Sequence, residues 1–255
     1  MLWYKSWLET RWRFLIGLLL LTCSAAGTVL AYPEVVKLLP LVPKLDLSGE
    51  IGRQVTQSIE LARDYRGYVW SHWFLKNMSQ IWVLFAVLLG IGGLFSQASG
   101  GGTLFTLSLP ASRNHLLGVR AATGLVELLV LALVPSLLLP ALSPTIGQTY
   151  GIGDTLIHGG CLFIAGAVFF SLAFLLSTVF SGVWRPLLIV LCVATALALF
   201  KQVFPDLSRY SLFRVMSAET YFRGGGLPWQ GLLASAAASA AMLYGATVNI
   251  ARRDF

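Results

Sequence analysis

The sequence has too few charged residues for an ordinary soluble protein. Only 11% of its 255 residues are Asp, Glu, Lys or Arg, whereas a soluble domain carries about 25%. Hydrophobic residues make up 56% of the chain, and the mean hydropathy is +0.76. So little polar surface cannot cover a water-soluble core of this size. The composition therefore excludes a soluble globular protein and favours an integral membrane protein.

Side chains that build catalytic or metal sites are also scarce. The three cysteines lie inside apolar runs, where they act as small packing residues, and the three histidines fall in separate segments without metal-ligand spacing. These residues are Cys23, Cys161, Cys192, His72, His115 and His158. The G-x-S-x-G, H-E-x-x-H and G-x-x-x-x-G-K-[ST] motifs are absent from the sequence. We expect no catalytic, cofactor or metal site in this chain, and a membrane-embedded enzyme is the least favoured class.

Six apolar stretches approach or exceed the length of about 20 residues that crosses a bilayer as a helix. They are residues 14–31, 76–95, 116–139, 155–180, 184–204 and 227–250. An even number of crossings places both termini on one side. The sequence thus predicts an all-α integral membrane protein, with six transmembrane helices in a single domain over residues 1–255.

Residues 1–13 precede the first span and are rich in tryptophan and charge. Lys5, Glu9 and Arg13 recur at four-residue spacing, and Leu8 and Trp12 occupy an adjoining stripe. This pattern is typical of a helix lying in the membrane interface. We expect an interfacial elbow helix that bends into the first span, with a cleaved signal peptide as the alternative.

Three longer connections separate the spans. Residues 32–75 and 203–226 are expected outside the cell and residues 96–115 in the cytoplasm, together with both termini. Basic residues near both ends favour this orientation, although the outer side is no poorer in Lys and Arg. Within the first outer loop, Val55, Ile59 and Ala62 share one face of a possible amphipathic helix. The net charge of +7 is spread over span ends, which favours lipid over nucleic acid as its partner.

Polar and small residues within the spans leave alternatives open. Glu127 lies near the middle of the third span, where an unpaired charge costs about 2.5 kcal/mol or more. It either lines a translocation path or makes a structural hydrogen bond between spans. Gly231, Ser235 and Ser239 recur at four-residue spacing in the last span. Such small residues allow close packing within the chain or against a second subunit.

The cytoplasmic segment has the most distinctive pattern. Residues 100–120 read GGGTLFTLSLPASRNHLLGVR. Thr103 can cap a short helix with Leu104 and Leu107 on its apolar face, and Pro110 ends that helix. An apolar helix exposed to the cytoplasm indicates a protein partner; a re-entrant bend packed on the chain's own spans is the alternative.

This segment resembles the cytoplasmic signature of ABC-2-type permeases, the membrane subunits of ATP-driven exporters. The matching residues are Gly102, Thr103, Leu104, Leu107, Pro110, Ser112, Arg113, Leu116, Leu117 and Gly118. The tryptophan-rich first helix and the last span with its basic tail resemble the family as well. The chain departs from the signature where SQASGG replaces the usual acidic residues, and where the basic residue after Leu-Leu-Gly is shifted to Arg120.

The resemblance implies a permease that couples ATP hydrolysis in a partner to substrate movement. Its coupling helix would contact the ATPase through residues Gly102, Thr103, Leu104, Leu107, Pro110 and Arg113. Two ATPase subunits would carry ATP and Mg²⁺, and a second permease subunit, identical or similar, would complete the transporter in a bacterial cell membrane. The alternative is a membrane protein without an ATPase, such as an ion-driven transporter, a channel or a scaffold. No residue pattern selects the substrate.

Overall fold

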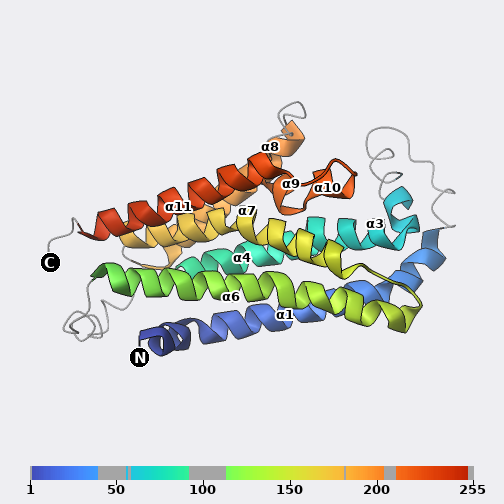
Figure 1. Ribbon diagram of the computed structural model, residues 1–255, viewed down its shortest axis with the longest axis horizontal. Helices are drawn as coiled ribbons and strands as arrows, with labels where there is room; N and C mark the ends of the chain where they lie inside the picture. The colour runs from blue at the N-terminus through green and yellow to red at the C-terminus, as the bar shows by residue number, and fades with distance from the viewer. Residues whose placement is uncertain are drawn as a thin grey trace.

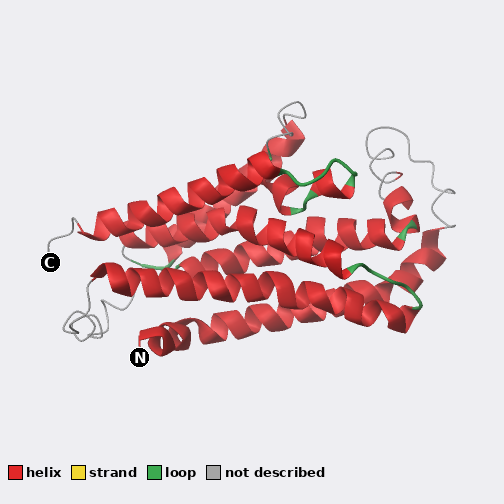
Figure 2. Cartoon of the chain, in the orientation of Figure 1, coloured by secondary structure: helices red, strands yellow, loops and turns green. Residues whose placement is uncertain are grey.

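The structure is a bundle of helices. The computed structural model describes residues 2–39, 56, 59–91, 113–180, 182–203 and 211–251, and every regular element within these ranges is a helix. The long helices lie side by side along one axis (Figures 1 and 2). The all-α class is therefore confirmed for the described part of the chain.

Six long helical segments are joined by shorter helices. The elements are α1 (Leu2–Leu38), α3 (Tyr65–Val69), the π-helix η2 (Trp70–Met78), α4 (Ser79–Gly90), α6 (Arg113–Leu142), the 3-10 helix η4 (Ser143–Ile146), α7 (Ile152–Val179), α8 (Trp184–Val203), α9 (Leu212–Met216), α10 (Glu219–Phe222) and α11 (Trp229–Ala251). The helices α1 and α6 begin, and α4 and α11 end, at one end of the bundle (Figure 1). We call this the terminal end and the opposite one the distal end.

Five helical segments of the described chain are long and apolar enough to cross a membrane. They are Leu2–Leu38, Tyr65–Gly90, His115–Ile146, Ile152–Val179 and Trp229–Ala251. The remaining expected span, 184–204, falls on α8, whose apolar stretch among the described residues is the shorter Trp184–Leu199. The helices thus indicate a membrane protein, with five of the six expected spans meeting the criteria of length and composition.

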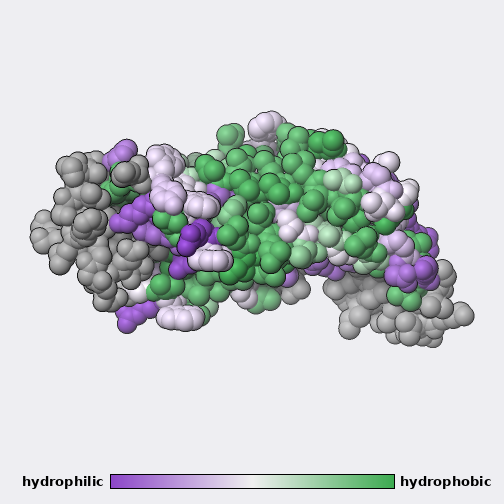
Figure 3. Space-filling view, turned by 90° about the horizontal axis from the view of Figure 1, so that it is seen from below, coloured by the Kyte–Doolittle hydropathy of each residue, from purple (hydrophilic) through white to green (hydrophobic). Residues whose placement is uncertain are grey.

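The surface of the bundle has the distribution of side chains that a bilayer requires. Figure 3 shows apolar side chains gathered over the middle of one face and hydrophilic side chains toward both ends. Exposed leucine, isoleucine, valine and tryptophan side chains are numerous. Such an apolar belt between polar ends matches a hydrocarbon core flanked by headgroups.

The helices on either side of the first loop are longer than the sequence predicts. Residues 32–75 were expected to form a loop, but α1 continues past Pro33 to Leu38, and helix resumes well before residue 75. The Tyr32 ring packs on Tyr65 and Tyr68, with ring centroids 4.8 and 5.0 Å apart. Tertiary packing of these rings offsets the backbone hydrogen bond that Pro33 removes. Of the proposed amphipathic helix, Val55 lies outside the described residues.

The helix α7 lies at the centre of the bundle and packs against α4, α6, α8 and α11. The α4–α7 contact depends on two glycines because these helices approach closely. A Cβ atom on Gly166 would lie 2.1 Å from the Trp82 ring, and one on Gly90 would lie 2.6 Å from the Phe170 carbonyl oxygen. Gly231 meets Val215 in the same way, and Ser235 and Ser239 are buried. The small residues of α11 therefore serve packing within the chain.

The distal end is closed by a network of charged side chains. Asp154 at the start of α7 pairs with Arg66, with 3.0 Å between Nε and Oδ2, and accepts a 2.7 Å hydrogen bond from the Tyr221 hydroxyl. Glu219 of α10 pairs with Arg214 at 2.8 Å and Arg223 at 2.9 Å. The expected second outer loop, 203–226, thus contains two short helices held against the bundle.

Candidate functional site: a polar junction of α1, α4 and α6

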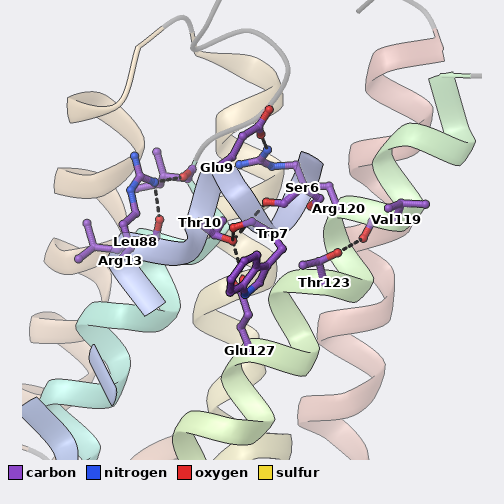
Figure 4. Close-up of polar contacts among 11 residues, drawn as sticks. Ser6, Trp7, Glu9, Thr10, Arg13, Leu88, Val119, Arg120, Thr123 and Glu127 are labelled. Atoms are coloured by element: carbon purple, nitrogen blue, oxygen red, sulfur yellow. Dashed lines mark hydrogen bonds and ion pairs between the residues drawn. The ribbon is translucent and has the colours of Figure 1, made fainter. Parts of the chain in front are cut away.

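Buried polar side chains meet near the terminal end, where α1 contacts both α4 and α6. We call Glu9, Thr10, Arg13, Arg120 and Glu127 the polar junction (Figure 4). Three of these residues come from the first turns of α1 and two from α6. The junction therefore connects the N-terminal segment to both helices that flank the expected coupling loop.

Glu127 is held by a hydroxyl from α1. The Thr10 hydroxyl donates a 2.6 Å hydrogen bond to Glu127 Oε1, and both side chains are buried. The second carboxyl oxygen, Oε2, is buried and has no hydrogen-bond partner among the described residues. A buried polar atom without a partner costs about 1–3 kcal/mol. Glu127 thus makes the interhelical hydrogen bond that one interpretation predicted, and it retains one open acceptor.

An ion pair joins the same two helices one residue earlier in α1. Arg120 Nη1 pairs with Glu9 Oε2, and both side chains are largely buried. Removing one member of a buried pair costs about 3–5 kcal/mol, because the other charge stays in a poorly solvated site. The pair therefore fixes the rotation of the first turns of α1 relative to α6.

Arg13 connects α1 to the end of α4. Its Nη1 donates hydrogen bonds of 2.8 Å to the Leu88 carbonyl and 2.5 Å to the Ile91 carbonyl. The last carbonyls of a helix have no partner within the helix and carry partial negative charge. A guanidinium supplies both N–H donors and positive charge, so Arg13 caps the C-terminus of α4. Figure 4 shows α1 changing direction close to this residue.

The expected ATPase-coupling residues fall mostly outside the described chain. Gly102, Thr103, Leu104, Leu107 and Pro110 lie outside the described residues. Arg113 opens α6, and its side chain is also outside the description. The part of segment 96–115 that is described is the start of α6, at the terminal end where α4 also ends (Figure 1).

The N-terminal segment is bonded to two other helices. Residues 2–13 belong to the continuous helix α1, and Glu9, Thr10 and Arg13 bond to α6 and α4. The interfacial elbow helix expected for residues 1–13 stays a prediction. The spacing of Glu9 and Arg13 signals a shared helix face. It cannot show that this face is turned toward protein, and a single Thr10 gives no signal at all.

His158 is buried at the distal end of the core. Its Nδ1 lies 2.7 Å from the Asp154 carbonyl oxygen, and its ring stacks on Phe74 with centroids 4.6 Å apart. No group of three or more His, Cys, Asp or Glu side chains that could hold a metal occurs in the described ranges. The His158 side chain is fully buried, and its Nε2 has no hydrogen-bond partner among those residues.

Comparisons of the chain with models of known protein families, with curated proteins and with solved structures find no match. Function must therefore be inferred from the residues themselves. Two features bear on it: the motif of segment 96–115, and the polar junction that holds together the helices on either side of that segment.

Proposed function

We propose that this chain is the membrane subunit of an ATP-driven exporter of the ABC-2 type. In this proposal separate ATPase subunits bind segment 96–115 in the cytoplasm, and ATP hydrolysis in them moves a substrate across the cell membrane. The support is the resemblance of residues 100–120 to the family signature, together with the apolar, all-helical bundle.

The polar junction carries the mechanical part of the proposal. Segment 96–115 connects α4 to α6; Arg13 holds the end of α4, and Arg120 and Glu127 hold α6 to the same turns of α1. Since these bonds are short and partly buried, a force on the segment reaches three helices together. A load shared in this way would tilt the helices as a group.

Coupling also requires two arrangements of the membrane helices that the ATPase states bind with different affinity. In this proposal the junction keeps α1, α4 and α6 together in both arrangements, and the change falls at the contacts of this group with the other helices. Thr10–Glu127 and Glu9–Arg120 lie on the α1–α6 contact. We assign Glu127 to the translocation path because it is a buried carboxyl in an expected span, with one carboxyl oxygen that has no hydrogen-bond partner among the described residues.

The test is capture of an ATP-hydrolysing subunit with the chain. The tagged protein is purified from membranes of its native host in a mild detergent, and Mg²⁺-dependent ATPase activity is measured. Leu107→Asp should abolish the co-purified activity, because a charge would disrupt an apolar docking face. Leu47→Asp, in the expected outer loop 32–75, is the matched control and should leave the co-purified activity intact.

Insertion of both variants is checked by their recovery in the membrane fraction. A Leu107→Asp protein that still brings down the full ATPase activity would rule out the docking role of the segment. Absence of any ATPase with the unmodified chain would favour a membrane protein that works without one.

A further inference from the structure

A groove beside Glu127 has the features of a ligand site. The groove encloses about 390 Å³ between α1 and α6. Its lining residues are Trp3, Tyr4, Trp7, Phe14, Thr123, Val126, Glu127 and Val130. Glu127 is the one charged residue in this set. The groove is therefore an apolar and aromatic surface with a single acid.

The acid has an unused acceptor. Glu127 is only 5% exposed, and its Oε1 is occupied by Thr10 while Oε2 has no hydrogen-bond partner among the described residues. Figure 4 shows the Trp7 indole beside the Glu127 side chain. A buried carboxyl oxygen without a donor is costly in this setting. A ligand that supplies the donor would remove that cost.

We propose that this groove binds a membrane-dissolved amphiphile with a primary ammonium head, which donates a hydrogen bond to Glu127 Oε2. Charge complementarity selects the head, since no Lys or Arg lines the groove. A primary ammonium has N–H donors, which a quaternary ammonium lacks. The indoles of Trp3 and Trp7 and the phenol of Tyr4 add cation–π attraction.

The position of the groove selects a ligand from the bilayer. Trp3, Tyr4, Trp7 and Val126 are exposed on the bundle surface. Trp and Tyr at one end of a spanning helix are typical of the headgroup level. The ammonium head would then sit at that level, with its alkyl chain along Val126 and Val130 of α6.

This site concerns binding alone and does not depend on an ATPase, so its failure and that of the proposed function are distinguishable. The test uses the full chain in nanodiscs of zwitterionic lipid. Two probes are compared by mole fraction in the lipid: a dodecylamine that carries one bromine at carbon 7 and the dodecanol brominated at the same carbon. Bromine on the bound chain quenches nearby tryptophans. The chain and all its variants carry Phe in place of the other exposed tryptophans, Trp12, Trp184 and Trp229, so that Trp3 and Trp7 are the exposed reporters.

For the unmodified chain, half-maximal quenching by the amine should occur at about tenfold lower mole fraction than by the alcohol, as a charge-assisted hydrogen bond implies. Glu127→Gln keeps the shape and the Thr10 bond and should make the two probes equal. Glu34→Gln, on the far part of α1 and paired with Lys37, should keep the preference. An unchanged preference in folded Glu127→Gln would overturn the proposal.

Two further arms complete the test. Trp7→Leu removes a ring that is 40% exposed. With quenching read from Trp3, it should weaken the preference for the amine about two- to fivefold, which keeps the proposal testable if Glu127→Gln does not fold. An unchanged preference in Trp7→Leu would count against the site. Ethylammonium, which lacks the alkyl chain, should not displace the brominated amine; displacement at equal concentration would overturn a membrane source.

Discussion

Replacing Arg13 by methionine tests whether the polar junction stabilises the end of α4. The change removes two charge-assisted hydrogen bonds, to the carbonyls of Leu88 and Ile91, while keeping an unbranched apolar side chain of similar reach. A hydrogen bond to a charged group contributes about 1.5–3 kcal/mol, and a cation at a helix C-terminus adds about 0.3–1 kcal/mol. Hydrogen bonds between membrane helices are weaker, averaging about 0.6 kcal/mol. Two bonds at this membrane average plus the helix-end contribution give about 1.5–2 kcal/mol. The charge on Arg13 strengthens both bonds, so we expect Arg13→Met to lower the free energy of unfolding by about 2–3 kcal/mol.

The matched control is Arg11→Met, two residues away in the same helix. The contact recorded for Arg11 is a cation–π approach to the adjacent Trp12 ring at 5.5 Å. Such a contact is worth about 0.5–1 kcal/mol at an exposed site. Arg13→Lys keeps the charge but not the planar donor set, so its stability should lie between those of Arg13→Met and the unmodified chain.

The assay is unfolding of the purified chain by added anionic detergent, followed by helix content, with amide hydrogen exchange as a local readout. Exchange should accelerate in the last turn of α4 in Arg13→Met and stay unchanged in Arg11→Met. Equal loss of stability in the two methionine variants, with no local change in exchange, would refute the capping role of Arg13.

Two other consequences follow from the packing and the charges. Gly166→Ala should lower the thermal midpoint, since its Cβ atom would lie 2.1 Å from Trp82. Gly160→Ala, whose Cβ atom would meet nothing within 4 Å, should leave the midpoint unchanged or raise it slightly. Similar midpoints for the two variants would refute the close approach of α4 and α7. The hydrogen bond to Asp154 raises the pKa of Tyr221. Because this pKa is raised in the folded state, the protonated tyrosine contributes stability that is fully present below the unfolded pKa of about 10 and is lost as pH rises through the folded pKa. Tyr221→Phe should therefore reduce the fall of the thermal midpoint with pH above about pH 10. An unchanged dependence of the midpoint on pH would contradict this origin.

The positions of the long helices could be predicted from the sequence because the cause is local. A run of about 20 apolar residues is long enough to cross a bilayer, and a helix satisfies all its backbone groups within the one segment. The expected spans at 116–139 and 155–180 therefore coincide with α6 and α7. The interhelical hydrogen bond of Glu127 could also be anticipated from the sequence, since a lone acid in an apolar run needs a polar partner.

The ends of the helices and the partners of the polar residues depend on contacts between distant segments. The helix α1 continues through Pro33 because Tyr32 meets Tyr65 and Tyr68, which lie more than 30 residues further along the chain. The residues around Pro33 alone do not predict that contact. The same holds for the π-helix η2, which replaces the predicted loop before residue 76.

What the sequence by itself determined is the class of the protein: apolar helices of bilayer length, few charges, and one acid in a span that had to be partnered. What only the tertiary structure decided is the identity of those partners. The spacing of Glu9 and Arg13 predicts one face of an interfacial helix. These residues and Thr10 form a junction only because α1 packs against α6 and α4. Hydropathy is a property of each segment, whereas a hydrogen bond between helices depends on their relative rotation, which is set by packing over the whole bundle.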